Sequence, residues 1–274
     1  MNQQGDSPLP QMIRESLPRS LFTKVVYYFP VLGSTNSYLK ELAKGGEPEG
    51  TLVITEKQTK GKGRMGRQWH SPSGVNLLFS TLFRPPFSID MVFSLTMLTT
   101  VSLVDAIREM TGLRTLIKWP NDIYCNGKKM AGILTEFSAD TRGIEYVVVG
   151  TGINVNWDMR DRPELEHMAT SLVKEVGHPI SRIALLSLIL EKLERNYKRL
   201  LRGEDDPIRD RWKRHSMVIG KEVLIDPEGE GKRAVVTGID RNGALLIEEE
   251  GGRTSSIVCG DVMVMFPTLP GSTP

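Results

Sequence analysis

The residues best suited to chemistry lie in one stretch, 118–136, where short apolar strands alternate with polar and charged side chains. It contains a turn dipeptide, an amide, a carboxylate, two lysines and a bare glycine: Asn126-Gly127, Asn121, Asp122, Lys128-Lys129 and Gly132. The dipeptide predicts a two-residue hairpin, because a type I′ turn needs positive φ at both positions. The hairpin would return both lysines to the amide and the carboxylate, and the glycine would let a ligand approach the backbone. The pattern indicates a site for a small anionic ligand, although a solvated turn would use the same residues.

A second candidate is the loop 57–69, which interleaves glycines with cations and ends in Trp69. The residues of this loop that could bind a ligand are Lys57, Lys60, Gly61, Lys62, Gly63, Arg64, Gly66 and Arg67. The glycines spell G-x-G-x-x-G, but a dinucleotide site needs a helix here and Pro72-Ser73-Gly74 forbids one. A Walker A loop fails as well, because Arg67-Gln68 stands where Lys-Ser/Thr is needed. Bare backbone N–H groups and guanidinium donors suit phosphate. A solvated basic loop and an RNA-binding arm are the alternatives, and Trp69 could stack on a base in either functional case.

Two further polar groups lie at the ends of predicted elements. Ser34-Thr35-Asn36 precedes an apolar stripe at helical spacing, so Ser34 or Thr35 is expected to cap a helix. A cap alone would explain this trio, but the same hydroxyl and amide groups could face a polar ligand. In the strand 145–156, Gly150, Gly152 and Asn154 alternate in phase and share one face.

The elements that would position these residues follow from periodicity. Strands are expected at 23–29, 51–56, 75–83, 115–117, 123–125, 130–137 and 145–156. Helices are expected after Ser34, at 88–110, from 169, at 182–202 and at 207–215. The charged face of 182–202, formed by Glu191, Lys192, Glu194, Arg195 and Lys198, is interpreted as solvated. From residue 217 the period changes to two, which predicts a small β-barrel of short strands without a catalytic constellation.

The totals exclude several classes of protein. The chain has 274 residues, 39% hydrophobic and 25% charged, with a net charge of +2, which favours neither nucleic acid nor a membrane surface. Cys125 and Cys259 match no zinc or CxxC spacing, so a reduced, cytoplasmic setting is expected. The N-terminus lacks a signal sequence, and no window is expected to be long enough to span a bilayer. No histidine pair has metal-ligand spacing.

Taken in order, the motifs resemble those of bacterial biotin protein ligases, also called biotin–[acetyl-CoA-carboxylase] ligases. The matching segments are Ser34-Thr35-Asn36, Gln58, the loop 61–67 with Trp69, Lys118-Trp119-Pro120-Asn121-Asp122, the segment 129–134 and the segment 150–156. The resemblance covers about 23–266. The family's loop usually reads GRGR, and Lys62 stands for its first arginine. Repressor members carry an N-terminal winged helix-turn-helix, whereas residues 1–22 are too short for one, so no DNA binding is expected.

The resemblance implies an α/β (α+β) fold with a mixed sheet and a C-terminal SH3-like barrel. The expected divisions are an N-terminal tail at 1–22, a catalytic domain at 23–216, the SH3-like domain at 217–267 and a tail at 268–274. It also implies that ATP, with Mg²⁺, activates biotin as biotinyl-5′-AMP, which then passes to a lysine of a biotin carboxyl carrier protein. That carrier would belong to acetyl-CoA carboxylase or a related carboxylase. The resemblance leaves a monomer and a homodimer both open.

The resemblance assigns roles residue by residue. The implied catalytic residues are Lys129, Asp122 and Arg64, with Asp122 orienting or deprotonating the acceptor lysine. The implied biotin-binding residues are Ser34, Thr35, Asn36, Gln58, Lys62, Gly63, Arg64, Lys129 and Gly132. The implied ATP or adenylate contacts are Arg64, Arg67, Trp69, Asn121, Lys129 and Asn154, and no metal is held by protein ligands alone. A lipoate or octanoate ligase or transferase of the same fold is the alternative enzyme, and an RNA-binding protein is the remote one.

Overall fold

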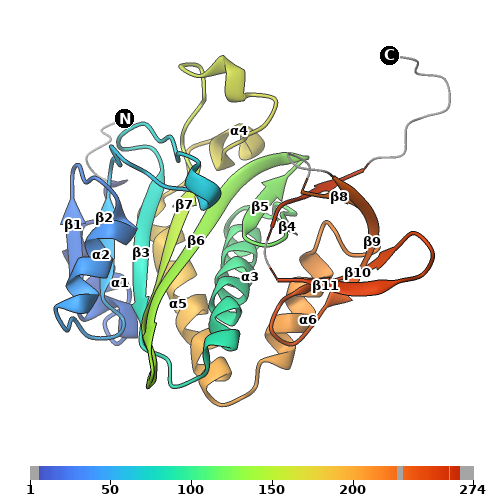
Figure 1. Cartoon of the computed structure of the whole chain (residues 1–274). Helices are drawn as coiled ribbons and strands as arrows, with labels where there is room; N and C mark the ends of the chain where they lie inside the picture. The colour runs from blue at the N-terminus through green and yellow to red at the C-terminus, as the bar shows by residue number, and fades with distance from the viewer. Residues whose placement is uncertain (1–5, 227–230, 259, 266–274) are drawn as a thin grey trace.

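The computed structural model describes residues 6–226, 231–258 and 260–265. The predicted tail 268–274, the end of the predicted SH3-like domain and Cys259 lie outside the described residues. Figure 1 shows a large twisted sheet flanked by helices, with a smaller C-terminal sheet beside it.

The large sheet has seven strands in the order β1-β2-β3-β7-β6-β5-β4. The strands are β1 (Val26–Phe29), β2 (Leu52–Thr55), β3 (Leu77–Phe83), β4 (Leu116–Lys118), β5 (Asp122–Cys125), β6 (Lys128–Asp140) and β7 (Gly143–Ile153). Only β1 and β2 run parallel, and the other neighbours are antiparallel. The mixed sheet predicted from the sequence is confirmed. The predicted hairpin is also present, since Asn126 has φ 49° and Gly127 has φ 77°, the positive values that a type I′ turn requires.

Helices cover both faces of this sheet (Figure 1). They are α2 (Thr35–Lys44), α3 (Val92–Thr111), α4 (Leu172–Val176), α5 (Arg182–Leu201) and α6 (Asp206–His215), with 3₁₀ turns at Arg64–Gly66, Ile89–Met91 and Pro163–Leu165. Leu39 and Ala43 of α2 form a small core with Val53, Leu82 and Val148. The larger core lies between the sheet, α3 and α5 and continues into the C-terminal sheet.

The expectation that no segment could span a bilayer was wrong on length and composition. Residues Ile89–Thr111 form one helical segment that is long and apolar enough to do so. Most of it is buried inside the protein, where Leu95, Leu98 and Ile107 are fully enclosed. A helix that is apolar nearly all round is expected in the core of a folded domain.

The face of α5 interpreted as solvated is partly buried. Lys192 is buried and its Nζ lies 2.5 Å from a carboxylate oxygen of Glu109 on α3. Glu194 accepts hydrogen bonds from the Ser20 hydroxyl at 2.5 Å and the Leu21 N–H at 3.0 Å. The prediction of a solvated face was wrong for Lys192 and Glu194, because these side chains face α3 and the N-terminal segment. The periodicity of α5 alone does not reveal these neighbours.

The described part of the predicted N-terminal tail is packed against α5. It forms α1 (Pro10–Ser16) and a 3₁₀ turn (Leu21–Thr23), and Ile13 is fully buried. Asp6 accepts hydrogen bonds from the backbone N–H and the Nε of Arg182, at 2.8 and 3.1 Å. Arg182 is itself buried and also donates to Glu56 at 2.5 Å. Its guanidinium group therefore joins the start of the chain to the start of α5.

The C-terminal sheet is antiparallel, with five strands in the order β11-β10-β9-β8-β12. The strands are β8 (Glu222–Ile225), β9 (Lys232–Ile239), β10 (Leu245–Glu249), β11 (Thr254–Ile257) and β12 (Val262–Val264). Within the described residues its edge strands β11 and β12 do not pair, so the sheet is not a closed barrel. Two hydrogen bonds join it to the large sheet: the Met217 N–H donates to the Ile117 carbonyl at 2.9 Å, and the Trp119 indole N–H donates to the Gly243 carbonyl at 3.0 Å.

Candidate active site

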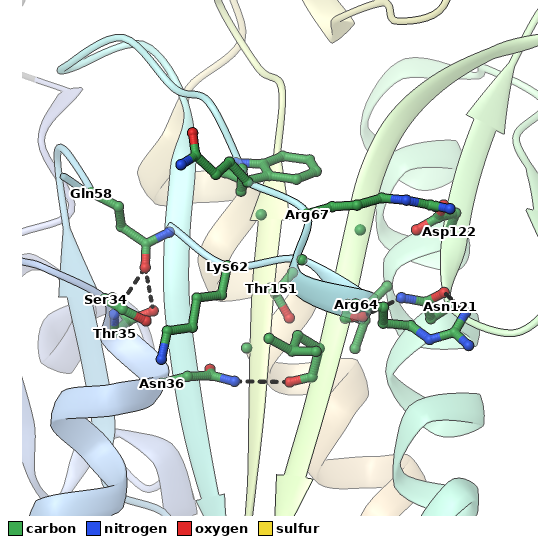
Figure 2. Close-up of a pocket in the computed structure, with 18 of the residues that line it drawn as sticks. Ser34, Thr35, Asn36, Gln58, Lys62, Arg64, Arg67, Asn121, Asp122 and Thr151 are labelled. Atoms are coloured by element: carbon green, nitrogen blue, oxygen red, sulfur yellow. Dashed lines mark hydrogen bonds between the residues drawn. The ribbon is translucent and has the colours of Figure 1, made fainter. Parts of the chain in front are cut away.

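One cavity of about 150 Å³ gathers most of the residues selected from the sequence. It lies over the large sheet, between the start of α2 and the β5–β6 hairpin, with the glycine-rich loop across it (Figure 2). The predicted residues that line it are Ser34, Thr35, Asn36, Gln58, Lys62, Gly63, Arg64, Arg67, Trp69, Asn121, Asp122, Lys129 and Gly132. Among the residues to which the resemblance assigns a role, only Asn154 does not line this cavity.

Hydroxyl and amide groups form the wall beside α2. The Ser34 hydroxyl accepts a hydrogen bond from the Ser37 N–H, which confirms the predicted cap. Thr35 donates its backbone N–H and its hydroxyl to Gln58 Oε1, at 2.9 and 3.2 Å (Figure 2). These contacts hold neutral donors and acceptors in fixed positions beside the cavity.

Asn36 lies at the base of the cavity and is held by several hydrogen bonds. Its Nδ2 donates to the Leu134 carbonyl at 3.0 Å and to a Glu136 carboxylate oxygen at 2.8 Å, and its Oδ1 lies 2.6 Å from the Ser80 hydroxyl. Burial alone would raise the pKa of Glu136, but hydrogen bonds from Lys40 and Asn36 hold it below its usual value. A Cβ at position 150 would stand 2.1 Å from Asn36 Oδ1, so only glycine fits there. Asn36 is thus held mainly by the protein itself.

The glycine-rich loop folds into a compact turn. The Gly63 N–H donates to the Arg67 carbonyl at 2.6 Å, and the Trp69 N–H donates to the Gly61 carbonyl at 3.1 Å. Trp69 then lies directly over β7, because a Cβ at position 152 would come within 2.6 Å of its ring. The indole ring therefore covers the backbone of Gly152.

The two loop arginines meet a carboxylate of the C-terminal sheet. Arg64 Nη1 lies 3.1 Å from Asp261 Oδ1, and Arg67 Nη2 lies 2.6 Å from Asp261 Oδ2. Arg64 also donates to the Gly260 carbonyl at 2.9 Å and to Asn121 Oδ1 at 3.3 Å. Asp261 lines the cavity, so the C-terminal sheet contributes a side chain that was not selected from the sequence. A lone aspartate before a short strand gives no local signal that it reaches another domain.

Lys129 and Asp122 form the charged pair that the hairpin predicted. Lys129 Nζ lies 2.6 Å from Asp122 Oδ2 and 5.8 Å from the centre of the Trp69 ring. Within the described part of the chain, Asp122 Oδ1 is buried and has no hydrogen-bond partner. Lys128, expected beside Lys129, does not line the cavity. One carboxylate oxygen is thus paired with Lys129, and the other is buried without a partner.

Further residues complete the lining or lie close to it. Gln68, Ile133, Leu134, Gly150, Thr151 and Gly152 line the cavity and were not selected as site residues. Asn154 follows β7 and donates to the Thr170 carbonyl at 3.1 Å. Burial lowers the pKa of Lys118, which pairs across β4 and β5 with Asp122. Among the described residues, no group of three histidine, cysteine, aspartate or glutamate side chains could hold a metal ion.

Comparison with known proteins agrees with this geometry. Residues 28–154 match the Biotin/lipoate A/B protein ligase family, and residues 218–265 match the Biotin protein ligase C terminal domain. The bifunctional ligase/repressor BirA of Bacillus subtilis is 39% identical over 88% of this chain and 74% of its own length. The chain belongs to the biotin protein ligases. The ligase is also 32% identical to the biotin–[acetyl-CoA-carboxylase] ligase of Paracoccus denitrificans, over 80% of this chain and 92% of that protein.

Solved structures extend the likeness to the fold of the ligase. The biotin protein ligase of Aquifex aeolicus in complex with biotin and ATP superimposes with a TM-score of 0.76 and is 28% identical. The match covers 88% of this chain and 99% of that one, so it includes both sheets. The fold expected from the motifs is confirmed, including the attachment of a smaller C-terminal sheet.

Proposed function

We propose that this cavity is where the ligase joins biotin to AMP and then to a carrier lysine. The ligase is ATP-dependent: it activates biotin as biotinyl-5′-AMP and transfers it to a lysine of a biotin carboxyl carrier protein. The observation that supports the placement is the convergence of Lys129, Arg64 and Arg67 on one cavity that also has a neutral polar wall. A carboxylate and a phosphate can meet only where cations offset their mutual repulsion.

The first step needs charge stabilisation and little else. A biotin carboxylate oxygen attacks the α-phosphorus of ATP, and the bond from that phosphorus to the bridging oxygen breaks, so pyrophosphate leaves. Lys129 would bind both the carboxylate and the α-phosphoryl oxygens, and Arg64 would bind the same phosphate bidentately. Arg67 and Asn121 would contact the nucleotide.

The neutral end of the cavity would hold the other end of biotin. Ser34, Thr35 and Gln58 would hydrogen-bond the ureido group, with Asn36 supporting them from below. Lys62 and Gly63 would close this end from the loop, because Lys62 Nζ already reaches the Ser37 hydroxyl at 3.2 Å. Gly132 leaves room for the valeryl chain, and Trp69 would cover it.

In the second step, a neutral lysine amine of the carrier attacks the acyl carbon, and the bond from that carbon to the phosphate oxygen breaks, so AMP leaves. Asp122 would orient the amine and take its proton, the role of a general base. The unpaired Oδ1 supports this assignment, because Lys129 already occupies Oδ2.

Magnesium would arrive with the triphosphate. The described residues contain no group of three side chains that could hold a metal ion, so the ion would be held mainly by phosphate oxygens and water. Its contribution would be to neutralise charge on the β- and γ-phosphates.

The test is incorporation of labelled biotin into a purified carrier domain with ATP and magnesium. Transfer to a wild-type carrier, and none to a carrier whose acceptor lysine is replaced by arginine, would support the proposal. Parallel reactions with lipoate and octanoate test whether the protein is instead a lipoate or octanoate ligase or transferase. Retention of RNA on a filter tests whether it is instead an RNA-binding protein. Incorporation of lipoate in place of biotin would contradict the assigned substrate.

We further propose that the partner is the carrier domain of a carboxylase, that the ligase acts in the cytoplasm, and that it does not bind operator DNA or membranes. The packing of residues 6–23 against α5 supports the proposal on DNA, because this segment is committed to the catalytic domain. Electrophoretic mobility in the presence of biotinyl-5′-AMP tests it. Sedimentation with and without that ligand decides between a monomer and a homodimer.

A further inference from the structure

Asp261 places a carboxylate where the proposed function needs an anionic ligand. Its two oxygens lie 3.1 and 2.6 Å from guanidinium nitrogens of Arg64 and Arg67, the arginines assigned to phosphate. It is the described carboxylate of the C-terminal sheet that lines this cavity. A negative side chain beside a phosphate site repels the phosphate and weakens its binding. The presence of Asp261 here therefore calls for another role.

The contact does not depend on a loose side chain. The Asp261 carbonyl accepts a hydrogen bond from the Asp226 N–H at 3.0 Å, and β12 begins at the next residue. The neighbouring Gly260 carbonyl receives Arg64 Nη2 at 2.9 Å. The C-terminal sheet therefore presents a side-chain acceptor and a backbone acceptor to the loop from a fixed position.

The loop has a reason to need this partner. Lys60, Lys62, Arg64 and Arg67 repel one another, and the loop buries few apolar groups, with Met65 at its tip 68% exposed. A compact loop arrangement with two adjacent guanidinium groups requires a nearby anion. Asp261 supplies that anion when no phosphate is bound.

We propose that Asp261 is a positioning residue that holds Arg64 and Arg67 over the cavity whenever phosphate charge is low, and so retains biotinyl-5′-AMP after pyrophosphate leaves. This inference rests on the proposed function. ATP carries a triphosphate and can draw both guanidinium groups to itself. The adenylate keeps one phosphate charge, so one guanidinium group needs another partner. The C-terminal sheet thereby keeps the reactive anhydride covered until the carrier arrives.

The test compares Asp261→Asn with wild type in three measurements. Dissociation of preformed biotinyl-5′-AMP, followed by capture of released label, should become about five- to twentyfold faster. Trypsin should cut the free variant faster within 60–67. The KM for ATP should stay level or fall, because ATP no longer competes with a carboxylate. Asp261→Glu should restore most of the retention.

Controls keep a structural effect apart from the proposed one. Glu248→Gln changes an exposed carboxylate of the same sheet and should change none of the three readouts. Urea unfolding of Asp261→Asn should match wild type. If it does not, retention of the adenylate by Asp261→Glu shows whether the carboxylate itself is needed. In a double-mutant cycle with Arg67→Gln, the combined effect on retention should be smaller than the sum of the two separate effects, since both changes remove the Arg67–Asp261 ion pair.

Unchanged retention of the adenylate in Asp261→Asn would overturn the proposal. So would a KM for ATP that rises as much as retention falls, because Asp261 would then align the arginines for ATP itself. These outcomes differ from failure of the proposed function, in which the wild-type protein would form no biotinyl-5′-AMP.

Discussion

Two glycines of β7 offer a matched perturbation of the site. Gly150 and Gly152 lie on the same strand and the same face, two residues apart. An alanine Cβ at position 150 would stand 2.1 Å from Oδ1 and 2.7 Å from Cγ of Asn36, while one at position 152 would stand 2.6 Å from the Trp69 ring. Both contacts are too short for a folded protein, so the neighbouring side chain would have to move in each variant. The two variants differ in whether that side chain can move.

Asn36 cannot move without breaking buried hydrogen bonds. It is 3% exposed and bonded to the Leu134 carbonyl, Glu136 and Ser80. At about 1 kcal/mol net for each bond, and more for a group left unpaired, Gly150→Ala should cost about 2–4 kcal/mol of unfolding free energy. Trp69 belongs to a surface loop, so Gly152→Ala should cost less than about 1 kcal/mol and instead displace the ring.

Urea unfolding followed by circular dichroism measures the first effect, and dissociation of biotinyl-5′-AMP measures the second. We expect Gly150→Ala to lower the urea midpoint strongly. We expect Gly152→Ala to keep the midpoint and to release the adenylate faster. Equal loss of stability in both variants would refute the reasoning, because it would mean that the loop is as firmly fixed as the buried amide.

Three further predictions concern the charged groups. Lys129→Ala should abolish biotin-dependent pyrophosphate release, whereas Asp122→Asn should slow transfer from preformed adenylate more than adenylation; near-normal release, or equal damage to both steps, would contradict these roles. Biotin with ATP should slow tryptic cutting within 60–67 much more than ATP alone, and equal cutting with adenylate bound would show that the loop is not a lid. Because the pKa of folded Glu136 lies below its ordinary value of 4.5, its stabilisation is present above pH 4.5 and is lost as pH falls through the folded value. Stability from pH 6 to pH 3 should therefore fall less in Glu136→Gln than in wild type, and identical slopes would refute the coupling.

Local rules predicted much of the fold and the site. The Asn126-Gly127 turn, the Ser34 cap and the amphipathic spacing of α5 each depend on neighbouring residues, and the structure has all three. The catalytic candidates Lys129 and Asp122 came from the same hairpin.

What the sequence missed depends on contacts between distant segments. Asp261 meets Arg64 across nearly two hundred residues, and Lys192 meets Glu109 across two helices. Neither hydrophobic periodicity nor turn motifs predict such a pairing, because each residue on its own looks like an ordinary charged residue at the surface. The same reason hid the packing of Asp6 on Arg182.

The spread of the lining residues along the chain affects when the protein can begin to work. The cavity takes residues from Ser34 near the start to Asp261 near the end. As the chain is synthesised, the loop and the hairpin leave the ribosome well before the last strands do. A chain made only as far as the hairpin would have most of the residues that line the cavity, but Arg64 and Arg67 would lack the carboxylate of Asp261. Completion of the cavity therefore waits for the C-terminal sheet, because Asp261 lines the cavity and pairs with both arginines.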